Sequence, residues 1–280
     1  MLKQRIITSL VLTPFVIWGV FSMPSVYFSL FILLLVGLSS WEWGHLSGIE
    51  NSLFKGLYTA ASLIVFVFLL WYIDITTRFF YVLLSISIAW WLYRIIRILF
   101  YRTATSTDAP LQRNGLNVAT AMATIVALLI PFYSIVYLRN DYDFPGYLFY
   151  LLMTIWTADV FAYFSGKFLG KNKLAPHVSP GKTWEGVYGA FVGTSIGAII
   201  GILSFGFNLR EGVLFFVLTF IVVAISIFGD LSESLYKRQN AIKDSGNLLP
   251  GHGGILDRVD SLVAAAPFYI VGLSLLGLLK

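Results

Sequence analysis

Long apolar runs separated by short polar stretches dominate this chain. A helix needs about 20 predominantly apolar residues to cross the core of a bilayer, with a tolerated range of roughly 17 to 25. By that criterion the pattern predicts nine membrane-spanning helices, at about 5–22, 25–41, 53–73, 78–100, 117–138, 146–165, 186–206, 211–229 and 261–279. The sequence therefore predicts an all-α fold, a polytopic bundle of transmembrane helices.

Composition supports a chain that lies in the membrane over its whole length. Hydrophobic residues make up 58% of the 280 positions and charged residues only 12%, whereas a soluble domain carries roughly a quarter charged residues. No stretch is polar enough and long enough to form a soluble domain. We therefore expect a single integral membrane domain, with N-terminal spans in 1–140 and C-terminal spans with the main polar loops in 141–280. The absence of cysteine excludes disulfides, thiolate metal sites and a Cys nucleophile.

The distribution of Lys and Arg predicts the orientation. Cytoplasmic loops retain basic residues, whereas translocated loops are poor in them. With nine spans and a cytoplasmic N-terminus, the opposite side receives only Arg78, Arg139, Arg210 and Lys280. The two longest polar loops, about 166–185 and 230–260, then share the cytoplasmic face, where nucleotides are found. The net charge of +5 suits anionic ligands there, although topology alone also produces a basic inner face. Lys3 and Arg5 precede an apolar run that lacks a small-residue cleavage site, so we expect an uncleaved first helix.

Carboxylates gather where loop 230–260 meets the membrane. Asp230 ends one apolar span, and Asp257 and Asp260 begin another, three residues apart and on one face if a helix starts near Leu256. An ionised Asp in a span costs about 2.5–3.5 kcal/mol, so it normally has a partner and a purpose. Oxygen ligands without Cys favour Mg²⁺ or Mn²⁺ over Zn²⁺. The alternative is that these acids form ion pairs with the neighbouring bases Lys237, Arg238, Lys243 and Arg258.

Two further segments carry polar residues that the bilayer does not explain. Asp159 is the only acid that we predict to lie well within a span, and it is either functional or a structural hydrogen-bonding group. Lys182, with hydroxyls at Ser179 and Thr183, opens the seventh span, where a helix N-terminus favours an anion; a capping turn with one snorkelling lysine is the alternative. A P-loop is excluded because its first glycine would fall at Pro176 and no strand precedes it.

The glycine-rich run 251–254 lets backbone approach a ligand closely and offers N–H groups to phosphate. His252 within it is either a neutral hydrogen-bonding residue or a phosphate contact.

Taken together, these motifs resemble the signature of the phosphatidate cytidylyltransferases, also called CDP-diacylglycerol synthases, of bacterial type. Upstream segments around 159–170 and 179–186 resemble the same family, so motifs cover roughly 155–265. Tyr236 departs from the usual aliphatic residue or Phe, and Val160 and Phe161 stand where smaller residues are usual. The signature positions are Ser234, Lys237, Arg238, Lys243, Asp244, Gly246, Pro250, Gly251, His252, Gly253, Gly254, Asp257, Arg258 and Asp260.

The resemblance implies transfer of the cytidylyl group of CTP to phosphatidate, by attack of the lipid phosphate on the α-phosphorus with release of pyrophosphate. Such a reaction requires anions to be held in line and their charge neutralised. We predict Asp230 and Asp257 as ligands of Mg²⁺, with Asp260 and Asp159 as further candidates and room for a second cation. Phosphate-binding and catalytic roles are expected of Lys237, Arg238, Lys243 and Arg258, and substrate binding of Ser179, Lys182, Thr183, Ser234, His252, Gly253 and Gly254. The expected partners are CTP, phosphatidate, membrane lipids and a second copy of the chain, without nucleic acid, in the bacterial cytoplasmic (inner) membrane with the active site facing the cytoplasm.

Three rival readings fit the sequence less well. A transporter predicts inverted repeats with broken spans in corresponding positions, and no such symmetry is visible. A CDP-alcohol phosphotransferase needs an Asp-Gly-x-x-Ala-Arg motif, which is absent, and a wider spacing than that of Asp257 and Asp260. A membrane scaffold would need no acidic cluster.

Overall fold

The computed structural model describes residues 13–73, 78–104, 117–140, 145–240, 242, 245–246 and 253–279. Residues 13–21 are helical. The further elements are α2 (Ser25–Leu46), α3 (Ser52–Tyr72), α4 (Arg78–Ala104), α5 (Val118–Met122), η1 (Ile125–Leu129), α6 (Ile130–Asn140), α7 (Pro145–Leu169), β1 (Lys173–Ala175), β2 (Ser179–Thr183), α8 (Trp184–Phe205), α9 (Leu209–Gln239) and α10 (Leu256–Leu275).

The predicted all-α membrane bundle is confirmed. Among the described residues, eight helical segments are long and apolar enough to cross a membrane, and they match the second to ninth predicted spans. One of the eight is formed by α5, η1 and α6 together. The first predicted span, 5–22, lies partly outside the described residues, so the total of nine spans stays a prediction. A short antiparallel hairpin of β1 and β2 joins α7 to α8. The expectation that no strand precedes Pro176 is therefore wrong, because β1 ends at Ala175.

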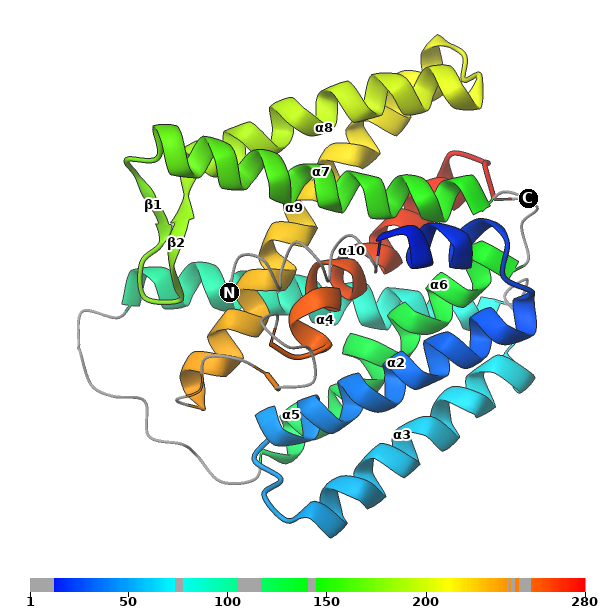
Figure 1. Ribbon diagram of the computed structural model, residues 1–280, viewed down its shortest axis with the longest axis vertical. Coiled ribbons are helices and arrows are strands. Elements are labelled where there is room, and N and C mark those ends of the chain that lie inside the picture. The colour runs from blue at the N-terminus through cyan, green and yellow to red at the C-terminus, as the bar shows by residue number, and fades with distance from the viewer. Residues whose placement is uncertain are drawn as a thin grey trace.

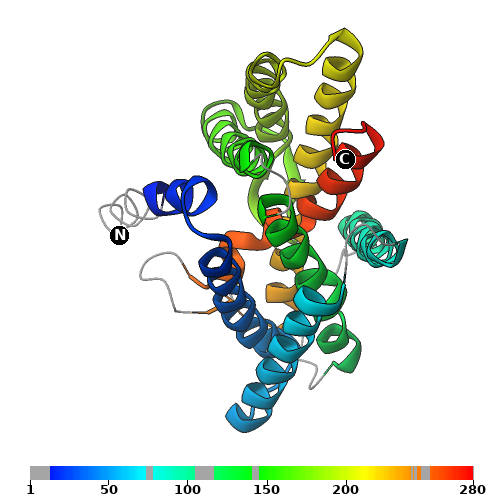
Figure 2. The same ribbon diagram turned by 90° about the vertical axis from the view of Figure 1, so that its right-hand side faces the viewer.

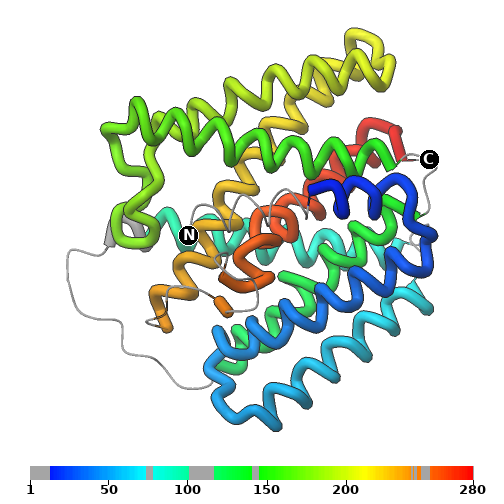
Figure 3. Tube along the Cα trace, viewed as in Figure 1, coloured from blue at the N-terminus to red at the C-terminus, as the bar shows by residue number. Residues whose placement is uncertain are grey.

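Two helical pairs form opposite edges of the bundle, α2 with α3 and α7 with α8 (Figures 1 and 2). The trace in Figure 3 shows α6, α9 and α10 between these edges. The described part of α6 is buried without interruption from Ile130 to Leu138, so it forms the centre of the core. Helices at the edges expose large apolar side chains instead, such as Leu30, Ile64 and Ile199, as a lipid-facing surface requires.

The helix ends are fixed by local sequence. Asn51 accepts hydrogen bonds from the first turn of α3, and Asn208 forms a capping box with Glu211 at the start of α9. Thr183 caps α8, its Oγ1 accepting from the Gly186 N–H at 3.2 Å. The predicted capping turn at the seventh span is therefore confirmed.

Two predicted boundaries are wrong, and both bear on the site. The polar loop predicted over 230–260 is helical as far as Gln239, because Leu231 and Leu235 pack against Ile98 of α4 and the β hairpin. A hydropathy pattern marks the end of an apolar run, whereas a helix continues wherever one face stays buried. Likewise α2 extends beyond the predicted 25–41 to Leu46.

Glycines bring α7 and α8 into close contact. A Cβ on Gly189 or Gly193 would collide with Ser165 or Phe161 of α7, so the backbones approach as small residues at a membrane helix interface allow. Phe161, larger than the family's usual residue there, lies over Gly193. This packing sets the N-terminus of α8 beside α7, where the pocket described next is found.

Candidate active site

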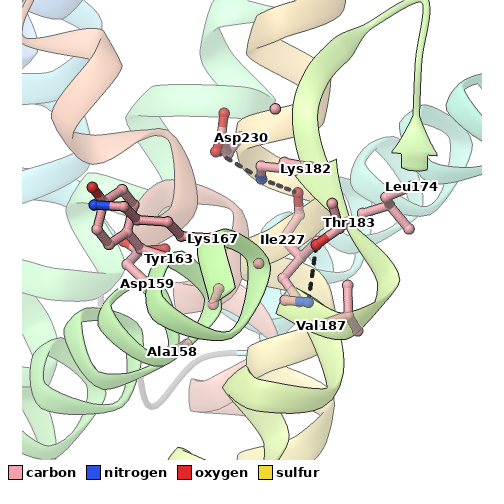
Figure 4. A pocket seen from close by; sticks show the side chains of 14 residues that line it. Ala158, Asp159, Tyr163, Lys167, Leu174, Lys182, Thr183, Val187, Ile227 and Asp230 are labelled. Carbon is pink, nitrogen blue, oxygen red and sulfur yellow. Dashed lines mark hydrogen bonds and ion pairs between the residues drawn. The ribbon is translucent and has the colours of Figure 1, made fainter. Parts of the chain in front are cut away.

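A pocket of about 390 Å³ lies where α7, α9 and the start of α8 meet the β hairpin (Figure 4). Its charged side chains come from three elements, and its small residues leave room for a ligand. The lining consists of Ala158, Asp159, Ala162, Tyr163, Gly166, Lys167, Leu174, Gly181, Lys182, Thr183, Gly186, Val187, Ile227 and Asp230.

A lysine–aspartate ion pair stands at the centre of this pocket. Lys182 Nζ lies 2.7 Å from Asp230 Oδ2, with the side chains 26% and 36% exposed. The ammonium also donates to the Ile227 carbonyl oxygen at 3.4 Å. Behind the pair, Ser234 donates to Asp230 Oδ1 at 3.3 Å. The lysine predicted on one polar segment thus meets the first carboxylate predicted on the other, and both remain accessible to a ligand.

The wall that α7 contributes carries Asp159 and Lys167. Asp159 is exposed towards the pocket, which favours the functional reading of this residue over a buried structural one. Asp230 and Arg258 lie close enough for their charges to act on Asp159, and Asp230 likewise acts on Asp260. The pocket therefore combines two carboxylates with two ammonium groups, with further charges of both signs nearby.

Asp257 does not line the pocket; it belongs to a buried network. Its Oδ1 accepts from Lys237 Nζ at 2.5 Å, with the two side chains only 10% and 14% exposed. Its Oδ2 accepts from the backbone N–H groups of Ser245 at 3.1 Å and Gly254 at 2.8 Å. The Ser245 hydroxyl lies 2.9 Å from the same oxygen. Oδ2 of Asp257 thus holds the segment before α10, and Oδ1 ties it to Lys237 of α9.

Glu42 of α2 is the second anchor of this segment, and the sequence reasoning missed it. The residue is 2% exposed, and its carboxylate accepts from the N–H groups of Ile255 at 3.0 Å and Leu256 at 2.8 Å. The Ser245 hydroxyl lies 3.0 Å from Glu42, so it shares one proton between Glu42 and Asp257. A carboxylate at a helix N-terminus satisfies N–H groups that lack intrahelical partners. Glu42 does this for α10 from a distant part of the chain.

The glycines of the signature fit around these carboxylates. Gly253 has a φ of 79°, a left-handed conformation that favours glycine. A Cβ on Gly254 would collide with Glu42 and Ser245, and one on Gly246 with Glu42. Because Gly246 and Gly254 have no side chains, the backbone can pack closely against Glu42.

Lys237 forms ion pairs with two carboxylates. Besides Asp257, its Nζ lies 3.5 Å from Glu233 Oε1. Glu233 is 4% exposed, and within the described structure its surroundings include the carboxyl groups of Asp257 and Asp260. The ion-pairing alternative is thus confirmed for Lys237, whose predicted role as a phosphate ligand gains no support from these contacts.

The other predicted residues fall outside the pocket or outside the described chain. Arg238 donates to the Val178 carbonyl oxygen at 3.3 Å, tying α9 to the hairpin. Ser179 begins β2 and does not line the pocket. Lys243 and His252 lie outside the described residues, so their predicted roles stay predictions.

The four predicted metal ligands are not gathered into one site. In the part of the chain that the structure describes, no three His, Asp or Glu side chains are placed to hold one ion. Asp159 and Asp230 nevertheless share one pocket. Mg²⁺ is usually held by one or two carboxylates with substrate phosphates and water, and this pair fits that requirement. Asp257 lies outside this pocket, and its predicted role as a metal ligand stays a prediction.

Comparisons with known proteins agree with these motifs. The model of the cytidylyltransferase family matches residues 3–276. A phosphatidate cytidylyltransferase of Pseudomonas aeruginosa is 40% identical over 270 residues, which cover 96% of each chain. One from Haemophilus influenzae is 36% identical over 290 residues, covering 96% of this chain and 97% of the relative. One from Bacillus subtilis is 42% identical over 151 residues, covering 52% of this chain.

Proposed function

Because the chain belongs to the cytidylyltransferase family, we propose that it makes CDP-diacylglycerol from CTP and phosphatidate in the Lys182–Asp230 pocket. The observation that carries this proposal is the meeting of the two sequence motifs in one pocket, through the ion pair at 2.7 Å. The phosphate oxygen of phosphatidate forms a bond to the α-phosphorus of CTP, and the bond from that phosphorus to the bridging oxygen breaks, releasing pyrophosphate.

The lysines of the pocket supply the positive charge that this transfer needs. Lys182 is held by Asp230 and Ile227 but stays partly exposed, so it can exchange its carboxylate partner for phosphate oxygens. Lys167 faces the same space from α7. As flexible point charges, both suit the neutralisation of a phosphate chain without fixing it bidentately. Catalysis of phosphoryl transfer rests largely on such positioning and charge neutralisation.

Phosphatidate reaches this pocket from the bilayer. Tyr163 lines the pocket and is largely exposed, as are its neighbours Val160 and Phe164 on α7. These side chains form a lipid-facing surface at the pocket's edge, so the acyl chains can stay in the membrane while the headgroup enters. A phosphate monoester with a second pKa of about 6 is mostly dianionic at neutral pH. It therefore attacks without a general base.

A divalent cation, Mg²⁺ in the first instance, would be held by Asp159 and Asp230 together with substrate phosphates. When bound, it neutralises charge on the phosphates and orients them. Asp260 does not line the pocket, and its role as a further metal ligand stays a prediction, whereas Asp257 and Glu42 hold the segment before α10 in place. A second cation stays a prediction.

The predicted orientation places this pocket on the cytoplasmic side of a bacterial inner membrane, where CTP is available. The basic residues of the predicted cytoplasmic loops support it. The homodimer implied by the family, and the expected lack of a nucleic-acid partner, stay predictions.

The test is pyrophosphate release by the purified protein with phosphatidate and Mg²⁺, comparing CTP with ATP and with no nucleotide. We expect release with CTP alone, and about hundredfold slower release in Asp230→Asn, which removes the charge and keeps the shape. Glu211→Gln is the matched control, because it removes a carboxylate from the first turn of the same helix. Release independent of CTP, or none from folded wild type, would contradict the proposal.

A further inference from the structure

A second polar pocket, of about 370 Å³, lies on another side of α9, among the ends of α2, α4 and α5. Asp230 faces the reaction pocket, whereas Tyr236 and Asn240, farther along the helix, face this one. The lining consists of Leu46, Ser47, Trp90, Tyr93, Arg94, Arg97, Asn117, Ala119, Thr120, Ala123, Tyr236, Gln239 and Asn240. Nothing in the proposed reaction uses this pocket.

Arg94 is the buried cationic side chain of this pocket. It is only 5% exposed, and its Nε donates to the Ser232 hydroxyl at 2.9 Å while Nη2 donates to the Ser232 carbonyl oxygen at 3.3 Å. Its guanidinium lies 3.9 Å from the centre of the Tyr236 ring. These contacts fix the plane of the guanidinium, and no acidic side chain of the described residues forms an ion pair with it. Tyr236, the departure from the family's usual residue, thus provides the surface on which Arg94 lies.

Arg97 adds a second positive charge one turn further along α4. It is exposed, and its Nη1 donates to the Tyr93 hydroxyl at 3.3 Å. Within the described ranges, no carboxylate makes an ion pair with Arg94 or Arg97, and none lines the pocket. Burying a guanidinium group without a counter-charge costs free energy, and a second guanidinium nearby adds repulsion. A bound anion would offset both.

The surroundings indicate that the anion comes with a lipid. Leu92, Tyr93 and Ile96 on the same part of α4 expose apolar and aromatic surface, as a lipid-facing helix does. Trp90 and Tyr93 in the lining are of the kind that lies at headgroup level. Basic pockets between membrane helices bind anionic headgroups. We propose that Arg94 and Arg97 form a binding site for the phosphate of an acidic phospholipid, separate from the reaction pocket.

The test uses the purified full chain in detergent, titrated with dioctanoyl phosphatidylglycerol or dioctanoyl phosphatidylcholine, with bound lipids counted by native mass spectrometry. Phosphatidylglycerol is chosen because it carries a net negative charge, which the zwitterionic phosphatidylcholine lacks, and is not the substrate. We expect it to bind more tightly than phosphatidylcholine, and Arg97→Gln to weaken it about tenfold, the loss expected of one charge-assisted hydrogen bond. Arg78→Gln, at the other end of α4, is the matched control and keeps wild-type binding.

Two further variants distinguish lipid bound at the second pocket from lipid bound at the reaction pocket. Lys182→Gln, which removes a cation from the reaction pocket, keeps phosphatidylglycerol binding if the second site holds the lipid. Arg94→Lys keeps the charge but loses the planar contact with Tyr236, and we expect an effect at least as large as that of Arg97→Gln. Equal binding of both lipids, unchanged binding in both arginine variants, or displacement of the lipid in Lys182→Gln alone would overturn the proposal. So would saturable binding of inorganic phosphate with no preference for the acidic lipid.

Discussion

Two lysine–aspartate pairs flank the C-terminal turns of α9, and they differ in their surroundings. Lys182 and Asp230 meet at 2.7 Å in an open pocket, with 26% and 36% of their side chains exposed. Lys237 and Asp257 meet at 2.5 Å with only 14% and 10% exposed. Asp257 accepts additional backbone hydrogen bonds, whereas Asp230 has Ser234 as its further side-chain partner among the described contacts.

The same chemical pair therefore serves two purposes. A solvent-accessible ion pair can exchange partners with a charged ligand at little cost in free energy. Water and the ligand replace the interaction between the two side chains. A buried pair cannot, since breaking it leaves an uncompensated charge in a medium of low polarity. We therefore propose that the exposed pair binds substrate, whereas the buried pair stabilises the structure.

The largest expected effect comes from breaking the buried pair. Asp257→Asn leaves Lys237 with Glu233 alone and puts an amide where N–H groups point at a carboxylate. We expect the free energy of unfolding to fall by about 3 kcal/mol, the low end for a broken buried pair. Thermal unfolding in detergent measures this. An Asp257→Asn protein as stable as wild type that lacks activity would instead favour the metal-ligand role predicted from sequence.

For the exposed pair we expect a large effect on turnover and a small effect on stability. Asp230→Asn should slow CTP-dependent turnover by about a hundredfold, because it weakens the binding of the cation that would neutralise charge in the transition state. Its thermal unfolding should stay close to that of wild type, because the pair is solvent-accessible. Measuring kcat and Tm on both aspartate variants tests the contrast directly. A large drop in the Tm of Asp230→Asn would remove the distinction between the two pairs.

Glu42→Gln tests whether the buried network acts on the reaction through position alone. The amide keeps the size, but its NH2 group faces one of the two N–H groups of Ile255 and Leu256 while its oxygen accepts from the other. An unsatisfied buried group costs about 1–3 kcal/mol. We expect a lower Tm and a kcat reduced about tenfold, with the KM for CTP less affected. Ser39→Ala is the matched control, since Ser39 is buried on the same helix without a side-chain hydrogen bond in the described structure. Activity equal to wild type in Glu42→Gln would show that the segment before α10 needs no such anchor.

The sequence predicts the spans and the principal residues of the pocket. It does not predict which lysine–aspartate pair is exposed and which is buried. Apolar runs report directly on helices that cross a bilayer, and the motifs contained Lys182, Asp230 and Asp159. Glu42 was missed because its partners lie more than 200 positions away, as with Ser245 at a separation of 203. Spacing within α10 placed Asp257 and Asp260 on one face correctly, yet it could not show which neighbours would take up their oxygens. Burial and long-range hydrogen bonds decide that, and neither is encoded in local pattern.

The smallest effect expected concerns Ser234, whose hydroxyl donates to Asp230 at 3.3 Å from one turn away on α9. Ser234→Ala removes one hydrogen bond at an accessible carboxylate, worth about 0.5–1.5 kcal/mol. Turnover should therefore fall by only about two- to tenfold, with no measurable change in thermal stability. Because Ser234 orients Asp230 without touching Lys182, the double variant with Asp230→Asn should be no slower than Asp230→Asn alone. Additive losses in the double variant would mean that Ser234 contacts substrate itself, and the exposed pair would then be part of a larger binding surface on α9.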